Sequence, residues 1–112
     1  MGSCLFCRIA AKEIPSQLIF EDERSLVFKD ISPKAPTHVL VVPKKHIASL
    51  LSSTDEDKDL LGHLQRVAAQ VAASLNLDSF RLVANNGRGA GQTVDHLHYH
   101  LMGGRAMQWP PG

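Results

Sequence analysis

The sequence has almost no excess of charge, few aromatic residues and no long apolar run. Its 112 residues include 12 lysines and arginines against 11 aspartates and glutamates, and the basic side chains are scattered along the chain. Scattered and balanced charge does not favour a nucleic-acid or membrane surface as a partner. No stretch has the length and apolar content of a signal peptide or a transmembrane helix. We therefore expect a soluble, cytoplasmic protein.

Cysteine is also scarce, since only Cys4 and Cys7 occur, in a Cys-x-x-Cys pair. The chain is too poor in cysteine for a disulfide framework, and its length fits one core, so we predict a single domain over residues 1–112. The pair alone leaves a disulfide, a redox centre and a metal site open. A redox pair is expected near a βαβ pattern, and a reducing cytosol disfavours a structural disulfide, so a metal site is the sharper hypothesis.

Histidine, in contrast, is concentrated: His96, His98 and His100 occupy alternate positions, interleaved with Leu97, Tyr99 and Leu101. In a helix the middle histidine would lie opposite the other two, whereas in a strand all three share one face. Tyrosine favours a strand, and Gly103-Gly104 would end it. A row of imidazoles on one strand face suits a binding or catalytic site. The alternatives are an adventitious metal-binding tract and a polar outer face.

A glycine-rich loop over residues 85–93 precedes this row of histidines. Its three glycines and one arginine allow backbone N–H groups to approach an anion closely, which favours a phosphate. The loop is neither the phosphate loop of the NTPases, because no Gly-Lys-Ser/Thr follows, nor a dinucleotide fingerprint that opens a helix.

The remaining pattern predicts an α+β fold. A short helix is expected over residues 4–13, a hairpin over 17–21 and 25–30, a buried strand over 39–42 that ends at Pro43, and a strand over 80–84. Ser53 and Glu56 form a candidate capping box for one long helix. Its apolar stripe is Leu60, Leu64, Val67, Val71 and Leu75. His63 lies on the polar stripe, so we expect it to be solvated and without a role. The sum is an antiparallel sheet of about five strands with the long helix on one face.

The histidine row followed by Leu-Met resembles the histidine-triad (HIT) family of nucleotide hydrolases and transferases. Further segments are similar to its Hint branch, the purine nucleoside phosphoramidases: Asp30 to His38, Pro43 to His46, Gly103-Gly104-Arg105 and Trp109-Pro110-Pro111-Gly112. The resemblance runs from about Cys4 to the last residue. It implies the HIT-like fold and a homodimer in which the sheets of two protomers join.

The resemblance also implies roles for individual residues. His98 would attack the α-phosphorus of a purine nucleotide and form a covalent nucleotidyl-histidine, with a hydrogen bond from its other ring nitrogen to a backbone carbonyl fixing the tautomer. His100 would contact the phosphate oxygens, Thr93 the leaving group, and His38 would complete the cluster. The nucleotide would further be bound by Asp30 at the ribose, Ile31 at the base, and Asn85, Gly91 and Gln92 along the phosphate loop. A structural zinc would be held by Cys4, Cys7, His46 and His96.

Three departures from the Hint pattern leave alternatives open. Asp95 stands where that branch usually has an aromatic residue, Ala90 replaces a frequent glycine, and Thr93 replaces a frequent serine. Thr93 resembles the Fhit branch, which cleaves dinucleoside polyphosphates. The expected reaction is hydrolysis of the P–N bond of an adenosine 5'-phosphoramidate. The alternatives are dinucleoside polyphosphate hydrolysis, a nucleotide-binding module without turnover, and a zinc-stabilised interaction domain.

Overall fold

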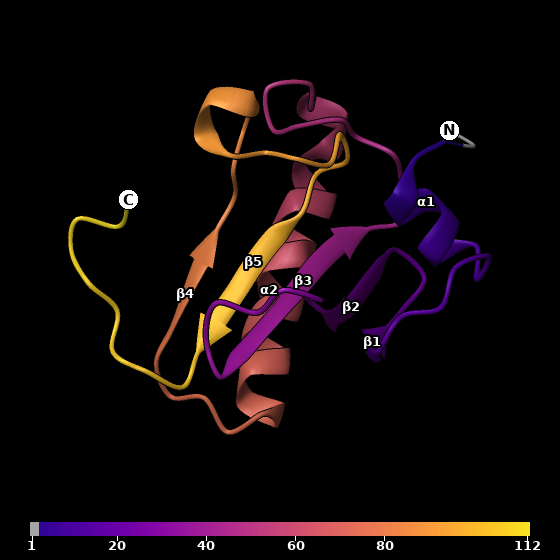
Figure 1. The fold of residues 1–112 in the computed structure, drawn as a ribbon. Helices are drawn as coiled ribbons and strands as arrows, with labels where there is room; N and C mark the ends of the chain where they lie inside the picture. The colour runs from indigo at the N-terminus through magenta and orange to yellow at the C-terminus, as the bar shows by residue number, and fades with distance from the viewer. Residues whose placement is uncertain (1–2) are drawn as a thin grey trace.

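The computed structural model describes residues 3–112 as one five-stranded antiparallel sheet with a long helix across one face (Figure 1). The sheet order is β1-β2-β3-β5-β4, so β3 lies at the centre. The strands are β1 Leu18–Glu21, β2 Ser25–Lys29, β3 Thr37–Pro43, β4 Phe80–Val83 and β5 Tyr99–Gly103. The helices are α1 Leu5–Ala10 and α2 Lys58–Ser74, with 3₁₀ turns η1 Asp55–Asp57 and η2 Arg88–Ala90. The predicted fold class is confirmed.

The long helix α2 packs its apolar stripe on one face of the sheet, as its spacing predicts. Leu60, Leu64, Val67 and Val71 are buried there together with Val39, Val41, Tyr99 and Leu101. The predicted capping box is wrong by one residue, because the N–H of Thr54 donates to Oδ2 of Asp57 at 2.9 Å. The reason is the 3₁₀ turn η1, which precedes α2 and shifts the start of the helical segment. No helix within residues 3–112 is long and apolar enough to cross a membrane.

The short helix α1 packs against the opposite face of the sheet. Phe6 and Ile9 of α1 are buried in a second apolar cluster with Leu26, Phe28, Leu40 and Val42. A six-residue helix is too short to be stable alone, so it depends on these tertiary contacts. The alternation along β2 and β3 therefore separates the two clusters, one under α2 and one under α1.

The histidine segment is only partly a strand. The alternation is confirmed, since Leu97, Tyr99 and Leu101 are buried in the cluster under α2. The predicted strand is too long, because β5 begins at Tyr99, and His96 and His98 lie in the loop before it. Pairing with β3 stops because Pro43 has no N–H, and its carbonyl accepts a hydrogen bond from Nε2 of His96 at 2.8 Å. β5 therefore begins only at Tyr99, because before it the carbonyl of Pro43 bonds to the His96 side chain and not to a main-chain N–H.

His63 is not the solvated residue without a role that its position on the polar stripe predicts. Its Nε2 atom lies 2.7 Å from Oδ2 of Asp22 in the turn between β1 and β2. The other carboxylate oxygen of Asp22 accepts hydrogen bonds from the N–H groups of Arg24 and Ser25. The prediction failed because helix periodicity says nothing of a hairpin turn that folds onto the polar edge of α2. His63 thus connects the hairpin to the long helix.

Candidate functional site

Two clusters of ligating side chains lie on either side of His98. The cysteine–histidine cluster consists of Cys4, Cys7, His46 and His96, and the Asp–His cluster consists of Asp30, His38 and His100. Within each cluster the candidate ligand atoms all lie within 4.8 Å of one another. Members of one cluster can be 92 residues apart in the chain, as Cys4 and His96 are, and the fold brings them together.

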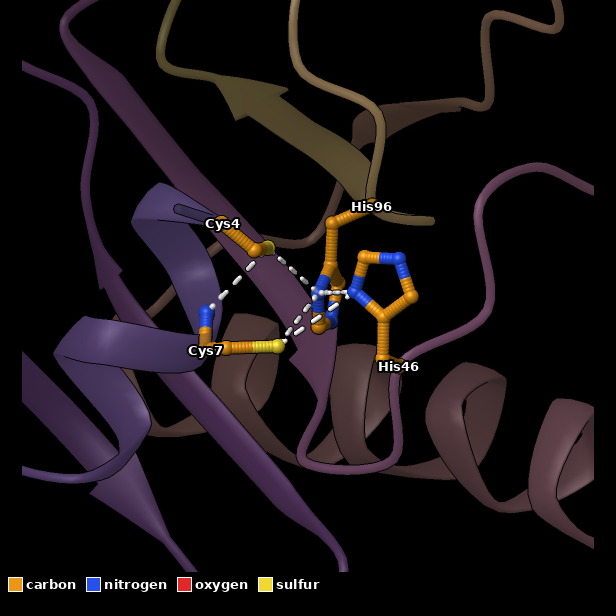
Figure 2. A group of neighbouring side chains, drawn as sticks. All are labelled: Cys4, Cys7, His46 and His96. Atoms are coloured by element: carbon orange, nitrogen blue, oxygen red, sulfur yellow. Dashed lines mark hydrogen bonds between the residues drawn. The ribbon is translucent and has the colours of Figure 1, made fainter. Parts of the chain in front are cut away.

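The cysteine–histidine cluster is assembled from three segments (Figure 2). Cys4 is the N-cap of α1 and Cys7 lies in its first turn, while His46 follows β3 and His96 precedes β5. Nδ1 of His96 lies 3.3 Å from Sγ of Cys4 and 3.6 Å from Sγ of Cys7. Nδ1 of His46 lies 3.3 Å from Sγ of Cys7 and 3.2 Å from Nδ1 of His96.

These separations match the edges of a tetrahedron around a zinc ion. With Zn–S near 2.3 Å and Zn–N near 2.0 Å, tetrahedral ligand atoms are about 3.5 Å apart for S···N and about 3.3 Å for N···N. Nε2 of His96 donates to the carbonyl of Pro43, which leaves Nδ1 unprotonated and available as a ligand. Burial raises the pKa of the Cys7 thiol to about 11, so a thiolate at neutral pH needs a cation beside it. The residues fit a closed metal centre.

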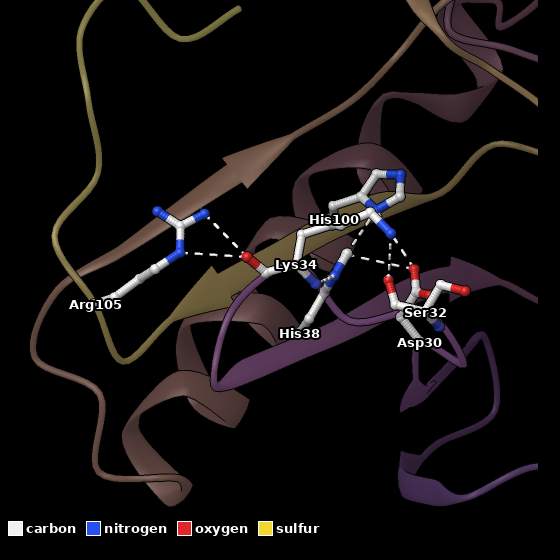
Figure 3. Close-up of polar contacts among 6 residues, drawn as sticks. All are labelled: Asp30, Ser32, Lys34, His38, His100 and Arg105. Carbon is white, nitrogen blue, oxygen red and sulfur yellow. Dashed lines mark hydrogen bonds and ion pairs between the residues drawn. The ribbon is translucent and has the colours of Figure 1, made fainter.

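The Asp–His cluster is ordered by a chain of hydrogen bonds (Figure 3). The N–H of Lys34 donates to Nδ1 of His38 at 2.9 Å, so the proton of the neutral His38 ring is on Nε2. Nε2 of His38 lies 2.9 Å from Nδ1 of His100 and donates to it. Nδ1 of His100 is thereby an acceptor, so its own proton is on Nε2. The chain leaves His100 as an N–H donor at its far end.

The same chain argues against a metal in the Asp–His cluster, although its three side chains are of the ligating kind. A metal on Nε2 of His38 requires a proton on Nδ1 of a neutral ring. That proton would meet the N–H of Lys34, and two donors would face each other at 2.9 Å. Oδ2 of Asp30, 3.4 Å from Nε2 of His38, adds a negative charge beside the proton of His38. The hydrogen bonds of the Asp–His cluster therefore favour a protonated Nε2 on His38 over a metal ion at that atom.

His98 lies between the two clusters and is 6% exposed. Its Nδ1 atom donates to the carbonyl of His96 at 2.7 Å, which leaves the lone pair on Nε2. The His98 ring stands perpendicular to that of Phe6 with centroids 5.1 Å apart, and its centroid is 5.0 Å from that of His100. A buried imidazole with a fixed lone pair beside an N–H donor can attack an electrophile whose charge that donor stabilises.

A model of the HIT domain matches residues 11–107 of the chain. The chain belongs to the HIT family. An uncharacterized HIT-like protein of Synechocystis is 52% identical over 109 residues, which are 96% of each chain. A HIT family hydrolase of Legionella pneumophila has a similar structure, with a TM-score of 0.97 and 49% identity over 98% of this chain and 100% of that one. A histidine triad protein of Clostridium difficile gives a TM-score of 0.94 and 43% identity, covering 96% of each chain.

Two imidazoles of this HIT domain, those of His38 and His100, are held neutral by burial. Burial lowers the pKa of His38 below its ordinary value, and the neighbouring Asp30 only partly offsets this. The pKa of His100 falls to about 4, mainly through burial and further through the charges of His98 and His38. At pH 7 both rings are therefore neutral, and they act through the placement of single protons.

The glycine loop of the HIT domain is closed by Gln92, whose side chain is engaged inside the protein. Its Oε1 accepts from the N–H of Gly87 at 2.8 Å, and its Nε2 donates to the carbonyl of Ala48 at 2.7 Å. The side chain of Gln92 thus shapes the loop and has few groups left for a ligand. Gly91 has a φ of +93°, which favours glycine there. Asn85 is half-buried beside it, and Thr93 is exposed.

Several residues of the site were missed by the sequence analysis. Phe6 contacts the His98 ring, Lys34 orders His38 through its main-chain N–H, and Pro43 orients His96 through its carbonyl. Only Phe6 acts through its side chain, so only Phe6 had a residue-type signal in the sequence. Main-chain partners leave no such signal, because every residue except proline has the same donor and acceptor.

Proposed function

We propose that this HIT-family protein is a nucleotide-binding hydrolase that cleaves the P–N bond of purine nucleoside 5'-phosphoramidates. The observation that carries the proposal is the His98 ring, which has its proton tied to the carbonyl of His96 and its Nε2 lone pair free. A neutral histidine with a fixed lone pair is a nucleophile for phosphorus. The similarity to the structure of a HIT family hydrolase of Legionella pneumophila supports hydrolysis as the general reaction.

The reaction runs in two displacements. Nε2 of His98 attacks the α-phosphorus, the P–N bond to the amine breaks, and Thr93 passes a proton from water to the departing amine nitrogen. The N–H on Nε2 of His100 donates to a phosphate oxygen as its negative charge grows. Water then attacks the phosphorus of the nucleotidyl-His98 and the bond to Nε2 breaks. The proton that this water gives up replaces the one taken from water in the first displacement, and the nucleoside monophosphate leaves with the Nε2 lone pair of His98 restored.

The nucleotide is assigned to the side of the site that carries Asp30. Oδ1 of Asp30 accepts from the N–H of Ser32, while Oδ2 faces the histidines and is available for a ribose hydroxyl. Ile31 is 99% exposed and offers an apolar surface to a base. Asn85, Gly91 and the main chain at Gln92 line the path of the phosphate. A histidine triad nucleotide-binding protein of Candida albicans, 37% identical and with a TM-score of 0.83, supports nucleotide binding.

A structural zinc in the cysteine–histidine cluster is part of the proposal. Four protein ligands leave no open position for water, so this metal would stabilise the fold and would not act as a Lewis acid. It would fix α1 to the segment before β5 through Cys4, Cys7 and His96.

We further propose that the protein is a homodimer. β4 is an edge strand, and its Phe80 is 42% exposed. The C-terminal segment runs past β4, outside the sheet (Figure 1), and its Trp109 is 82% exposed. A second copy would cover an unpaired edge and a large apolar side chain that are otherwise costly to leave in water.

The decisive experiment incubates the purified protein with an adenosine 5'-phosphoramidate and, in parallel, with a diadenosine polyphosphate, and measures AMP release. We expect turnover of the phosphoramidate and trapping of an adenylylated protein by rapid quenching. Faster turnover of the diadenosine polyphosphate would favour the alternative that Thr93 suggests. AMP binding without turnover of either compound would leave a binding module and overturn the proposal.

A further inference from the structure

Arg105 follows β5 and lies beside the loop that joins β2 to β3 (Figure 3). Its Nε and Nη2 atoms both donate to the carbonyl of Lys34, at 3.2 and 3.0 Å. Its Nη1 atom donates to the carbonyl of Ala106 at 3.0 Å. The guanidinium thus links two main-chain carbonyls, and Arg105 takes part in none of the salt bridges found within residues 3–112.

The backbone before Arg105 is shaped for this contact. Gly104 has a φ of +93°, and a Cβ atom there would lie 2.8 Å from Cβ of Pro36. Only glycine therefore allows the chain leaving β5 to approach the β2–β3 loop so closely. Gly104 therefore brings the following residue, Arg105, to Lys34.

Lys34 is the residue that sets the protons of the Asp–His cluster. Its N–H fixes Nδ1 of His38 as an acceptor, and His38 in turn fixes Nδ1 of His100. Within residues 3–112, the other hydrogen bonds found near Lys34 on its N-terminal side are local, since its Nζ atom donates to the carbonyl of Ser32 and the N–H of Ser32 donates to Oδ1 of Asp30. Two parallel hydrogen bonds from a planar guanidinium restrain the carbonyl of Lys34 in direction as well as in position.

We propose that Arg105 is a positioning residue of the reaction, which fixes the tautomers of His38 and His100 by holding Lys34 in place. Arg105 touches neither histidine. Its effect passes through the Lys34 main chain to His38, and from His38 to the N–H that His100 presents to a phosphate oxygen. The catalytic part of this inference rests on the proposed function, whereas the tautomer part does not.

The test compares Arg105→Gln with Arg81→Gln in otherwise unchanged protein. Arg81 is the matched control, because its Nη2 atom also donates to a main-chain carbonyl, that of Gln108 at 2.9 Å, and within residues 3–112 its side chain has no hydrogen bond to the β2–β3 loop or to a histidine. The first measurement is the ¹⁵N shift of the histidine ring nitrogens, taken without nucleotide. We expect two well-separated shifts for each ring of His38 and His100 in the wild type and in Arg81→Gln, and partial averaging in Arg105→Gln.

The second measurement is steady-state cleavage of an adenosine phosphoramidate. We expect Arg105→Gln to lower kcat about tenfold, the value of a charged hydrogen bond of roughly 1.4 kcal/mol, with little change in KM. Arg105→Lys should recover only part of the rate, because an ammonium cannot make the two parallel bonds. Unchanged ring shifts in Arg105→Gln, or equal losses of rate in Arg105→Gln and Arg81→Gln, would overturn the inference. A wild type without turnover would refute the proposed function alone, since the ring shifts still decide whether Arg105 sets the tautomers.

Discussion

The cysteine–histidine cluster and the Asp–His cluster contain similar side chains but are prepared for different chemistry. In the first, the carbonyl of Pro43 accepts a hydrogen bond from Nε2 of His96, which leaves the unprotonated Nδ1 facing the thiols of Cys4 and Cys7. In the second, the N–H of Lys34 takes the lone pair of His38 and leaves its proton facing His100. One main-chain group per cluster therefore decides whether a histidine ring turns a lone pair or a proton toward its cluster.

His98 shows how close the two kinds of environment can be along the chain. It is two residues from a member of the first cluster and two from a member of the second. Its Nδ1 atom donates to the carbonyl of His96, and its ring meets that of His100 edge-on with centroids 5.0 Å apart. His98 thus lies next to both clusters, and its Nε2 lone pair is not used by either of them. The comparison teaches that two clusters of ligating residues can differ in their fitness for a metal, and that the partner of the second ring nitrogen shows the difference.

The largest effect should follow from His98→Ala, which removes the group between the clusters. We expect AMP release from an adenosine phosphoramidate to fall roughly 10³-fold or more, because no other side chain would form the covalent intermediate. Metal content and secondary structure should be unchanged, since neither cluster loses a ligand. Turnover like that of the wild type, measured on protein of intact fold, would refute the nucleophile assignment.

Cys7→Ser should distinguish the roles of the two clusters, because it is expected to lower zinc content and thermal stability. Serine is a poor zinc ligand, so we expect zinc by elemental analysis to fall from one per chain and the thermal midpoint to fall by about 10 °C or more. Asp30→Asn, the matched change in the Asp–His cluster, should leave the zinc content at one per chain. If carefully purified wild type contains no zinc, the metal reading of the first cluster is wrong.

The pH dependence of stability should report the Asp–His cluster. The pKa of His100 is about 4 in the folded protein against an ordinary value of 6.5, owing first to burial and then to His98 and His38. Between pH 6.5 and about 4 the unfolded chain binds a proton that the folded His100 does not. Protonation of His100 in the unfolded chain therefore does not lower the free energy of unfolding above pH 6.5. As the pH falls from 6.5 to about 4, it lowers that free energy by no more than about 1.4 kcal/mol per pH unit.

Chemical unfolding at pH 7, 6 and 5 would measure this slope in the wild type and in His100→Gln. Glutamine does not titrate, so the variant should lose less stability on acidification than the wild type does. His38 also has a lowered pKa through burial, so a smaller slope should persist in the variant. Equal slopes in the two proteins would show that His100 is not held neutral by the fold.

The sequence predicted the parts of this molecule that depend on residue type and spacing. The alternation of Leu97, Tyr99 and Leu101 with the histidines survives even where the strand does not, because burial on the α2 side fixes it. The long helix, the sheet and the meeting of Cys4 and Cys7 with His46 and His96 were likewise predictable. These features all come from side-chain chemistry repeated at a fixed period or shared by a family.

What the sequence could not predict depends on single contacts between distant segments. The start of β5 is set by the missing N–H of Pro43, and the tautomers of His38 and His100 are set by the main chain of Lys34. Neither contact has a periodicity, and a main-chain donor looks the same at every residue. The pair of His63 and Asp22 is of this kind as well, because a helix and a turn 41 residues apart in the chain meet only in the fold.

His63→Ala should give the smallest effect, and it tests a contact outside both clusters. Although burial raises the pKa of Asp22, hydrogen bonds from Arg24, Ser25 and His63 lower it to about 2, so the carboxylate is charged at neutral pH. Removing one of its donors should lower the unfolding free energy by about 1 kcal/mol, measured by urea unfolding at pH 7. His63→Gln, which keeps an N–H donor, should retain most of that stability. Arg66→Ala is the control on the same helix, because its side chain is exposed. If His63→Ala lowers the unfolding free energy no more than Arg66→Ala does, the hydrogen bond of His63 to Asp22 adds no stability. The helix and the hairpin would then be held together by their apolar contacts alone.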